Sequence, residues 1–173
     1  MTPQERLEQA IRHREEETRP QRIERTLWLS NHLPAPAVIM GRAEPLHLLE
    51  EAKSVFIYGQ FAAALILSLA VIEHCLVEEL QDRGLLRRSP GLSESVRLAA
   101  DAKVIPADWV APIELLAKRR NSFVHFRDDG DEHGIAMRIR AEKMHPRVVM
   151  EADAKEALAW MFKAFNATLH EAA

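Results

Sequence analysis

The apolar residues of this chain recur at helical spacing over most of its length. The stretch from Gln60 to Arg83 is apolar on nearly every side and is followed by Gly84, a residue that commonly ends a helix. A second clear pattern covers about residues 152–170, where large apolar side chains recur every three or four positions opposite charged ones. These patterns predict an all-α protein, a helical bundle built around one long central helix.

Further helices are expected before and between these two. Thr2, Pro3 and Glu5 form the signature of a capping box with proline at the first helical position, and Pro20 should break or kink the charged helix that follows. The remaining expected helices cover residues 21–31, a segment that ends near 58–59, a segment that opens at 89–90, and a segment from between 108 and 112 to about 126.

Two segments depart from the helical pattern. Residues 33–37, Leu-Pro-Ala-Pro-Ala, predict a stiff extended connector. The chain is thus expected to consist of an N-terminal charged helical arm with this connector (1–41) and a helical domain (42–173). Between residues 135 and 140, apolar positions recur at every second residue, which is the spacing of a strand. Residues 148–150 could pair with it, so a small β-hairpin is one interpretation of the segment before the last helix.

The composition narrows the class of protein. The chain has 173 residues, of which 47% are hydrophobic and 28% charged, so it is neither disordered nor collagen-like and suffices for one domain. The formal net charge of −3 excludes a uniformly basic nucleic-acid coat, so any contact with nucleic acid must come from a local patch. The single cysteine, Cys75, excludes an intrachain disulfide and a cysteine-rich zinc module, and it fits a reducing compartment.

Neither the first residues nor the longest apolar run predicts a membrane protein. The first residues are charged and contain no apolar signal-peptide core. The run from Val55 to Ile72 has 18 uncharged residues, which is the lower limit for a membrane span. Because polar residues interrupt this run and Glu73 ends it, we interpret it as a buried core helix. We therefore expect a soluble, cytoplasmic protein with no membrane partner.

Two charged residues lie where the helical pattern places apolar ones. Glu73 falls in the middle of the apolar sector of the 60–83 helix, and Arg120 lies on the apolar stripe of the 108–126 helix. A buried charge needs a partner, so the simplest interpretation is a Glu73–Arg120 ion pair between two packed helices. Such a pair can also be purely structural.

A cluster of cationic and hydrogen-bonding residues surrounds this arginine. The members of the cluster are Lys118, Arg119, Arg120, Asn121, His125 and Arg127. Clustered guanidinium and ammonium groups suit a phosphate, whereas most charged runs are only solvated helix faces. The cluster is therefore a candidate site for phosphate chemistry, with a solvated surface as the alternative.

The order of these residues resembles the motif of a known family. Residues 120–125, Arg-Asn-Ser-Phe-Val-His, are similar to the R-N-x-x-x-H motif of HEPN (higher eukaryotes and prokaryotes nucleotide-binding) domains. Residues 58–63 and 71–76 resemble the family's Y-x-G-x-x-x-A and E-x-x-L helices, and the resemblance covers roughly residues 44–170. It implies a HEPN-like bundle. HEPN domains include metal-independent ribonucleases of toxin, anti-phage and CRISPR-linked systems, and also non-catalytic binding modules.

Carried over to this chain, the resemblance implies an endoribonuclease site. His125 would act as general acid or base, Arg120 would stabilise the transition state, and Asn121 would orient the phosphate or the imidazole. The 2′-OH of the RNA would attack its own phosphorus and leave a cyclic phosphate, without a metal ion or cofactor. The expected supporting residues are Glu73 and Arg119. The residues expected to contact the RNA backbone are Lys118, Arg119 and Arg127.

The resemblance also implies partners. HEPN nucleases generally work as homodimers that face two motifs across one cleft, so a homodimer is expected, with an antitoxin or another protein as a further partner. Two other interpretations stay open. One is a non-catalytic HEPN-like module for dimerisation or binding. The other is a metal site at residues 125–133, HFRDDGDEH, but this spacing matches neither an EF-hand loop nor a zinc signature, so we expect no metal.

Overall fold

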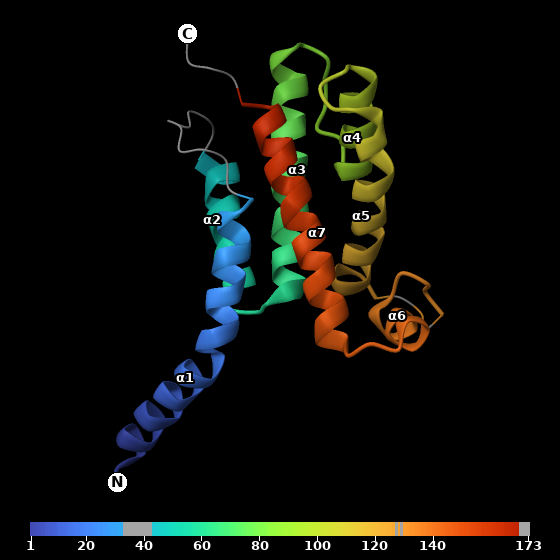
Figure 1. Ribbon diagram of the computed structural model, residues 1–173. Helices are drawn as coiled ribbons and strands as arrows, with labels where there is room; N and C mark the ends of the chain where they lie inside the picture. The colour runs from blue at the N-terminus through green and yellow to red at the C-terminus, as the bar shows by residue number, and fades with distance from the viewer. Residues whose placement is uncertain (33–42, 127, 129, 170–173) are drawn as a thin grey trace.

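The computed structural model describes residues 1–32, 43–126, 128 and 130–169, and every regular element among them is a helix (Figure 1). The predicted all-α class is thereby confirmed. The elements in chain order are α1 (Pro3–Ser30), α2 (Ala43–Ile57), α3 (Phe61–Asp82), α4 (Leu92–Asp101), a 3₁₀ turn (Ala107–Trp109), α5 (Val110–Val124), α6 (Ile135–Glu142) and α7 (Pro146–Ala167).

Helix α3 is the centre of the bundle, as its apolar sequence predicts. It packs against α2, α4, α5 and α7, and in Figure 1 it runs alongside α7. Its large side chains, such as Leu65, Leu69 and Ile72, are buried because neighbouring helices cover it on several sides. The chain leaves this helix through Gly84, whose φ of +69° is the left-handed conformation that glycine adopts most readily.

Helix α1 contains the predicted capping box, but Pro20 does not end it. Thr2 accepts a hydrogen bond from the backbone of Glu5, and the helix continues to Ser30 with Pro20 inside it. Side chains donate to backbone carbonyls just before the proline, for example from Arg22 Nη2 to Glu15 O at 3.0 Å. Figure 1 shows the axis of α1 changing direction partway along, which is the kink that a proline produces.

Only the last part of α1 joins the core of the bundle. Arg25 and Leu29 are its buried residues, whereas the first six turns are exposed almost throughout. Arg25 and Leu29 are thus packed with the helical domain, although both precede the expected connector. The expected connector at 33–37 lies outside the described residues.

The interpretation of residues 135–150 as a β-hairpin is wrong. Residues 135–142 form α6, and residues 148–150 lie in the first turns of α7, which begins at Pro146 rather than near 152. Proline suits this first helical position, and the ring of His145 caps the helix by accepting from the backbone N–H of Arg147. Six residues that alternate between apolar and polar are too few to establish a strand. A short helix such as α6, which has no buried residue, shows no apolar stripe at helical spacing that would have indicated a helix instead.

Among the described residues, α3 is the one helix long and apolar enough to cross a membrane. Half of its most apolar window is buried inside the bundle. A central core helix meets the same criteria of length and hydropathy, so a soluble protein is consistent with this fold. The cytoplasmic location stays a prediction.

The buried thiol of Cys75 on α3 should be chemically inert in the folded protein. Burial raises the pKa of this thiol from 9.0 to about 11, so it stays protonated at neutral pH. We expect no reaction with a thiol reagent at pH 8 until denaturant unfolds the chain. Because the folded state holds this proton more tightly, the free energy of unfolding should fall as pH rises from about 9 towards 11.

Cys75→Ala is the control for both measurements. It should abolish the reaction in denaturant and flatten the alkaline loss of stability. Rapid labelling of the native wild type at pH 8 would contradict the predicted burial.

Candidate functional site

The predicted catalytic residues lie at the C-terminal end of α5. The helix ends at Val124, and His125 follows as its C-cap in an extended conformation, with φ −130° and ψ 142°. The backbone N–H of His125 donates to Asn121 O at 3.0 Å, which fixes the last turn. His125 is exposed to solvent at this end of the helix. It is therefore placed where a large substrate could reach it.

Arg120 and Asn121 contact each other at the same end of α5. Arg120 Nη2 donates to Asn121 Oδ1 at 3.0 Å, and both residues are half-buried. Arg120 Nε is buried and has no hydrogen-bond partner. An arginine has five N–H donors, so this guanidinium retains capacity for another acceptor. The arrangement suits recognition of a phosphate oxygen by Arg120 while Asn121 fixes its orientation.

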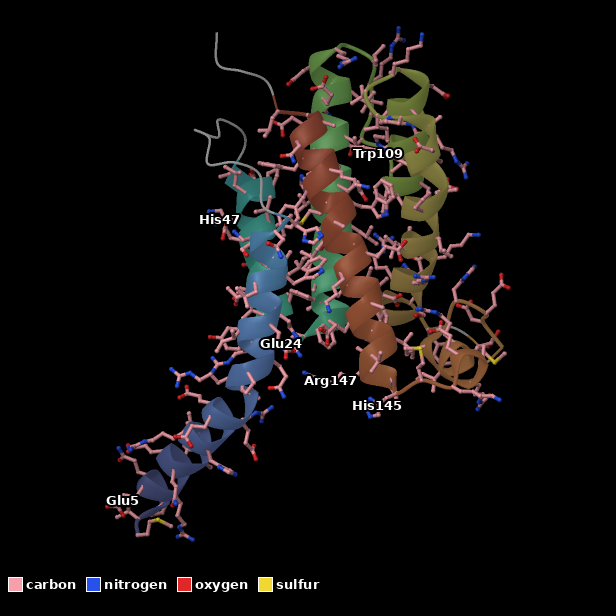
Figure 2. The ribbon with its side chains drawn as sticks, in the orientation of Figure 1. Glu5, Glu24, His47, Trp109, His145 and Arg147 are labelled. Atoms are coloured by element: carbon pink, nitrogen blue, oxygen red, sulfur yellow. The ribbon has the colours of Figure 1, made fainter. Side chains whose placement is uncertain are left out.

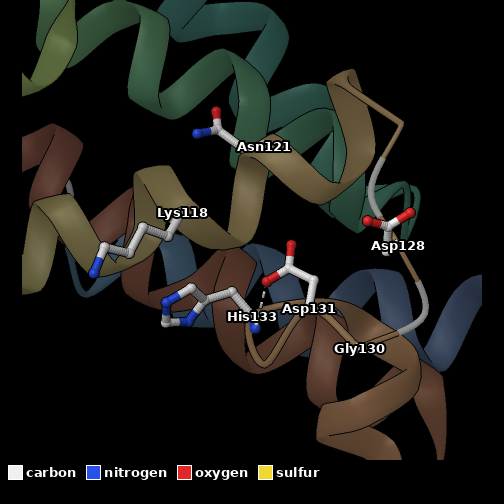
Figure 3. A pocket seen from close by; sticks show the side chains of 6 residues that line it. All are labelled: Lys118, Asn121, Asp128, Gly130, Asp131 and His133. Carbon is white, nitrogen blue, oxygen red and sulfur yellow. Dashed lines mark hydrogen bonds between the residues drawn. The ribbon is translucent and has the colours of Figure 1, made fainter.

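Two neighbouring pockets lie between the end of α5 and the loop that precedes α6. The larger pocket, of about 580 Å³, is lined by Lys118, Asn121, Asp128, Gly130, Asp131 and His133 (Figure 3). The smaller pocket, of about 220 Å³, is lined by His125 among others and shares Asp128 and Asp131 with the larger one. Asn121 and His125 thus open into adjacent hollows on either side of one acidic loop.

The polar groups of the larger pocket come from two segments. Figure 3 shows the side chains of Lys118 from α5 and His133 from the following loop extending to the same side of the pocket. Asp131 accepts from the backbone N–H of His133 at 3.0 Å, which holds the loop in a turn. His133 is one residue of this pocket that the motif does not include, and its position beside α5 is visible only in the fold.

Arg119 is held in a buried ionic network rather than in the pocket. Its Nη1 donates to Asp153 on α7 at 3.0 Å and to Glu156 at 3.2 Å. Asp153 is only 2% exposed and also binds Arg138 of α6, with 2.9 Å from Nη2 to Oδ1. Burial lowers the pKa of the Arg138 guanidinium, but Asp153 and Glu142 raise it by more, so this side chain stays charged.

The network replaces the ion pair that the sequence led us to expect. Among the described residues, no ion pair joins Glu73 to Arg120, and Glu73 is partly exposed on α3. The inward-facing arginine of α5 is the neighbouring residue, Arg119, and its buried carboxylate is on α7 instead of α3. The signal that could have revealed this is the lone Asp153 in line with Ala157 and Met161, on the buried face of the last helix.

The other predicted site residues fall in different places. Lys118 is exposed and lines the larger pocket, whereas Arg127 lies outside the described residues. In the part of the chain that the structure describes, no three histidine, cysteine or acidic side chains are grouped as a metal ion would require. The alternative metal site at 125–133 therefore has no ligand cluster there, with residues 127 and 129 outside the description.

Comparisons with family models, curated proteins and solved structures gave no match. The class that the fold and site define is an all-α bundle with Arg120, Asn121 and His125 at one end of α5. Asn121 and His125 each line one of two pockets, and a buried Arg–Asp–Arg network joins α5, α6 and α7.

Asp153 should contribute strongly to stability. Asp153→Ala leaves two largely buried guanidiniums without their shared anion, so we expect a loss of about 3 kcal/mol in the free energy of unfolding. The matched control is Glu142→Gln, which removes a 3.5 Å contact to the same Arg138 from a carboxylate that is 40% exposed. That variant should lose less than about 1 kcal/mol.

Urea unfolding measures both variants, and amide hydrogen exchange of α6 shows where the effect lies. Loss of the network should also reduce the protection of α6, since α6 has no buried residue of its own to hold it on the bundle. Equal and small losses for the two variants would contradict the role assigned to Asp153.

Proposed function

We propose that this protein is a metal-independent endoribonuclease of the HEPN type. The observation that carries the proposal is the position of Arg120, Asn121 and His125 at the end of α5, where Arg120 donates to Asn121 and where Asn121 and His125 each line one of two neighbouring pockets. The resemblance of residues 120–125 to the HEPN motif supplies the reaction class. His125 is exposed and the Arg120 side chain is half-buried, so both side chains have surface that an RNA phosphodiester could contact.

The proposed reaction is transesterification within the RNA. His125 removes the proton of a 2′-OH, whose oxygen forms a bond to the adjacent phosphorus while the bond from phosphorus to the 5′-oxygen breaks. A proton donor then protonates the departing 5′-oxygen, and the products are a 2′,3′-cyclic phosphate and a 5′-hydroxyl. Arg120, oriented by Asn121, stabilises the negative charge that develops on the phosphoryl oxygens. No metal ion is required, because the nucleophile is already part of the substrate.

The two neighbours of His125 favour a homodimer for this activity. Phe126 is 95% exposed and Val124 is 42% exposed, so two apolar side chains flank the proposed catalytic histidine. Large aromatic side chains of this kind are typical anchors of protein interfaces. A second copy of the chain would cover them and bring a second motif to the same cleft, which supplies the second proton-transfer group.

The alternative function is a non-catalytic HEPN-like module that dimerises or binds a partner. The same exposed Phe126 favours it, because an interface needs this surface whether or not RNA is cleaved. RNA cleavage, and not the oligomeric state, therefore separates the two functions. A role in a toxin or anti-phage system, with an antitoxin as partner, is proposed only together with the endoribonuclease function, because it requires RNA cleavage.

The test of catalysis is cleavage of end-labelled single-stranded and structured RNA in excess EDTA. Wild type should produce cyclic-phosphate ends, and His125→Ala should lower the rate at least about a hundredfold, the usual contribution of a general acid or base. His47→Ala is the matched control, because His47 is an exposed histidine on α2 away from this site (Figure 2). It should cleave like wild type. No cleavage by folded wild type on either RNA would favour the binding module.

The test of the interface is the molar mass in solution. Sedimentation of wild type at tens of micromolar should give a dimer, and Phe126→Ser should give a monomer, since it removes the most exposed apolar side chain beside His125. Leu85→Ser, at a leucine that is 54% exposed beyond the end of α3, is the control and should stay dimeric. A monomeric wild type, or a dimeric Phe126→Ser, would overturn the proposed interface.

A further inference from the structure

Three arginines converge at the turn between α2 and α3, on the other side of α7 from the proposed nuclease site. Arg22 and Arg25 come from α1, and Arg147 is the second residue of α7. In Figure 2 the labelled side chain of Arg147 extends from the start of α7 into the space beside α1. Figure 1 shows α1 and α2 on one side of α7 and α5 and α6 on the other, so this cluster and the motif of α5 are separate features.

Gly59 makes the approach of two guanidiniums possible. Its φ is +75°, and a Cβ at this position would lie 2.3 Å from Arg147 Nη2 and 3.1 Å from Arg25 Nη1. Both cationic nitrogens therefore lie against the same bare stretch of backbone. Both guanidiniums also lie on the ring of Phe61, with Cζ at 5.0 Å from its centroid for Arg25 and 5.1 Å for Arg147.

The acceptors present in this cluster do not match its donors. Arg25 is only 5% exposed, and its Nη1 donates to Ile57 O at 3.1 Å. Its Nε is 3.5 Å from a carboxylate oxygen of Glu151 but makes no hydrogen bond. Glu151 also pairs with Lys155 at 3.1 Å, so a single carboxylate faces several cations. A buried guanidinium with an unused donor next to a second guanidinium is costly unless an anion joins them.

We infer that Arg25 and Arg147 at Gly59 form a binding site for a phosphate group. A tetrahedral phosphate presents several oxygens to two planar guanidiniums at once, which matches the two guanidiniums that meet at Gly59 and the exposed side chain of Arg147. Arg147 is exposed, so the ligand can enter from solvent, while the ring of Phe61 forms the apolar floor. Arg22 lies at the edge, with its Cζ 5.5 Å from the ring centroid of Tyr58 and its Nε also without a partner.

This site does not depend on the proposed nuclease activity. Its phosphate can be inorganic phosphate or the terminal phosphate of an RNA, since both present the same oxygens. A site of this kind would place an anion between the end of the α1 arm and the start of α7. It would thereby fix the orientation of the arm relative to the bundle.

The test is isothermal titration of the full-length protein with sodium phosphate, against sodium chloride at equal ionic strength. Wild type should show saturable binding of phosphate and none of chloride. Arg147→Gln should weaken the binding at least about tenfold, because it removes charge-assisted hydrogen bonds to the ligand. The matched control is Arg140→Gln, at an exposed arginine of α6 with the same change of charge. It should bind phosphate like wild type.

The source of the phosphate is distinguished by competition with two short RNAs, one with a 5′-phosphate and one with a 5′-hydroxyl. Displacement by the first alone assigns the site to an RNA terminus, and displacement by neither assigns it to the free ion. Arg22→Gln provides a second variant and should weaken binding less than Arg147→Gln. Absence of saturable phosphate binding to wild type, or equal weakening by Arg147→Gln and Arg140→Gln, would overturn the site.

Discussion

Coverage of α3 is the constraint on which the rest of this structure depends. A 22-residue helix that is apolar on nearly every side must be covered by other helices, and α2, α4, α5 and α7 do so. Because α5 and α7 both pack on α3, they also lie close enough for Arg119 to reach Asp153. The buried carboxylate then binds a second cation from α6, which has no buried side chain to attach it otherwise.

This arrangement leaves His125 exposed at the end of α5, with Arg120 and Asn121 half-buried before it. Of the two adjacent arginines at the end of α5, Arg119 is held by Asp153, and Arg120 donates to Asn121. His125 follows the last residue of α5 and has an extended backbone, so its side chain does not continue the helical spacing of α5. Within the charged run 118–120, Arg119 therefore belongs to the buried ionic network, whereas Lys118 lines the larger pocket, where a ligand could contact it.

Helix α7 takes part in a cluster of charged side chains on each of two sides. Towards α5 and α6, a buried acid gathers arginines and the charges balance. Towards α1, the guanidiniums of Arg25 and Arg147 meet at Gly59, and the carboxylate of Glu151 beside Arg25 is shared with Lys155. The charges of the first arrangement balance, so it stabilises the fold, whereas in the second two guanidiniums lie together at Gly59, which favours an anion between them. The same residue type thus serves structure on one side and the inferred binding on the other.

The sequence by itself determined the helical class, the buried central helix, the capping box and the position of Arg120, Asn121 and His125 near the end of one helix. These are local properties, because the period of apolar residues and the residues at helix ends act over a few positions. Only the tertiary structure decided which arginine faces inward, because a one-residue step turns a helix by about 100° and the neighbour across it is distant in sequence. It alone also decided that residues 135–142 are helical, since Arg138 of this segment binds an acid that follows 15 residues later.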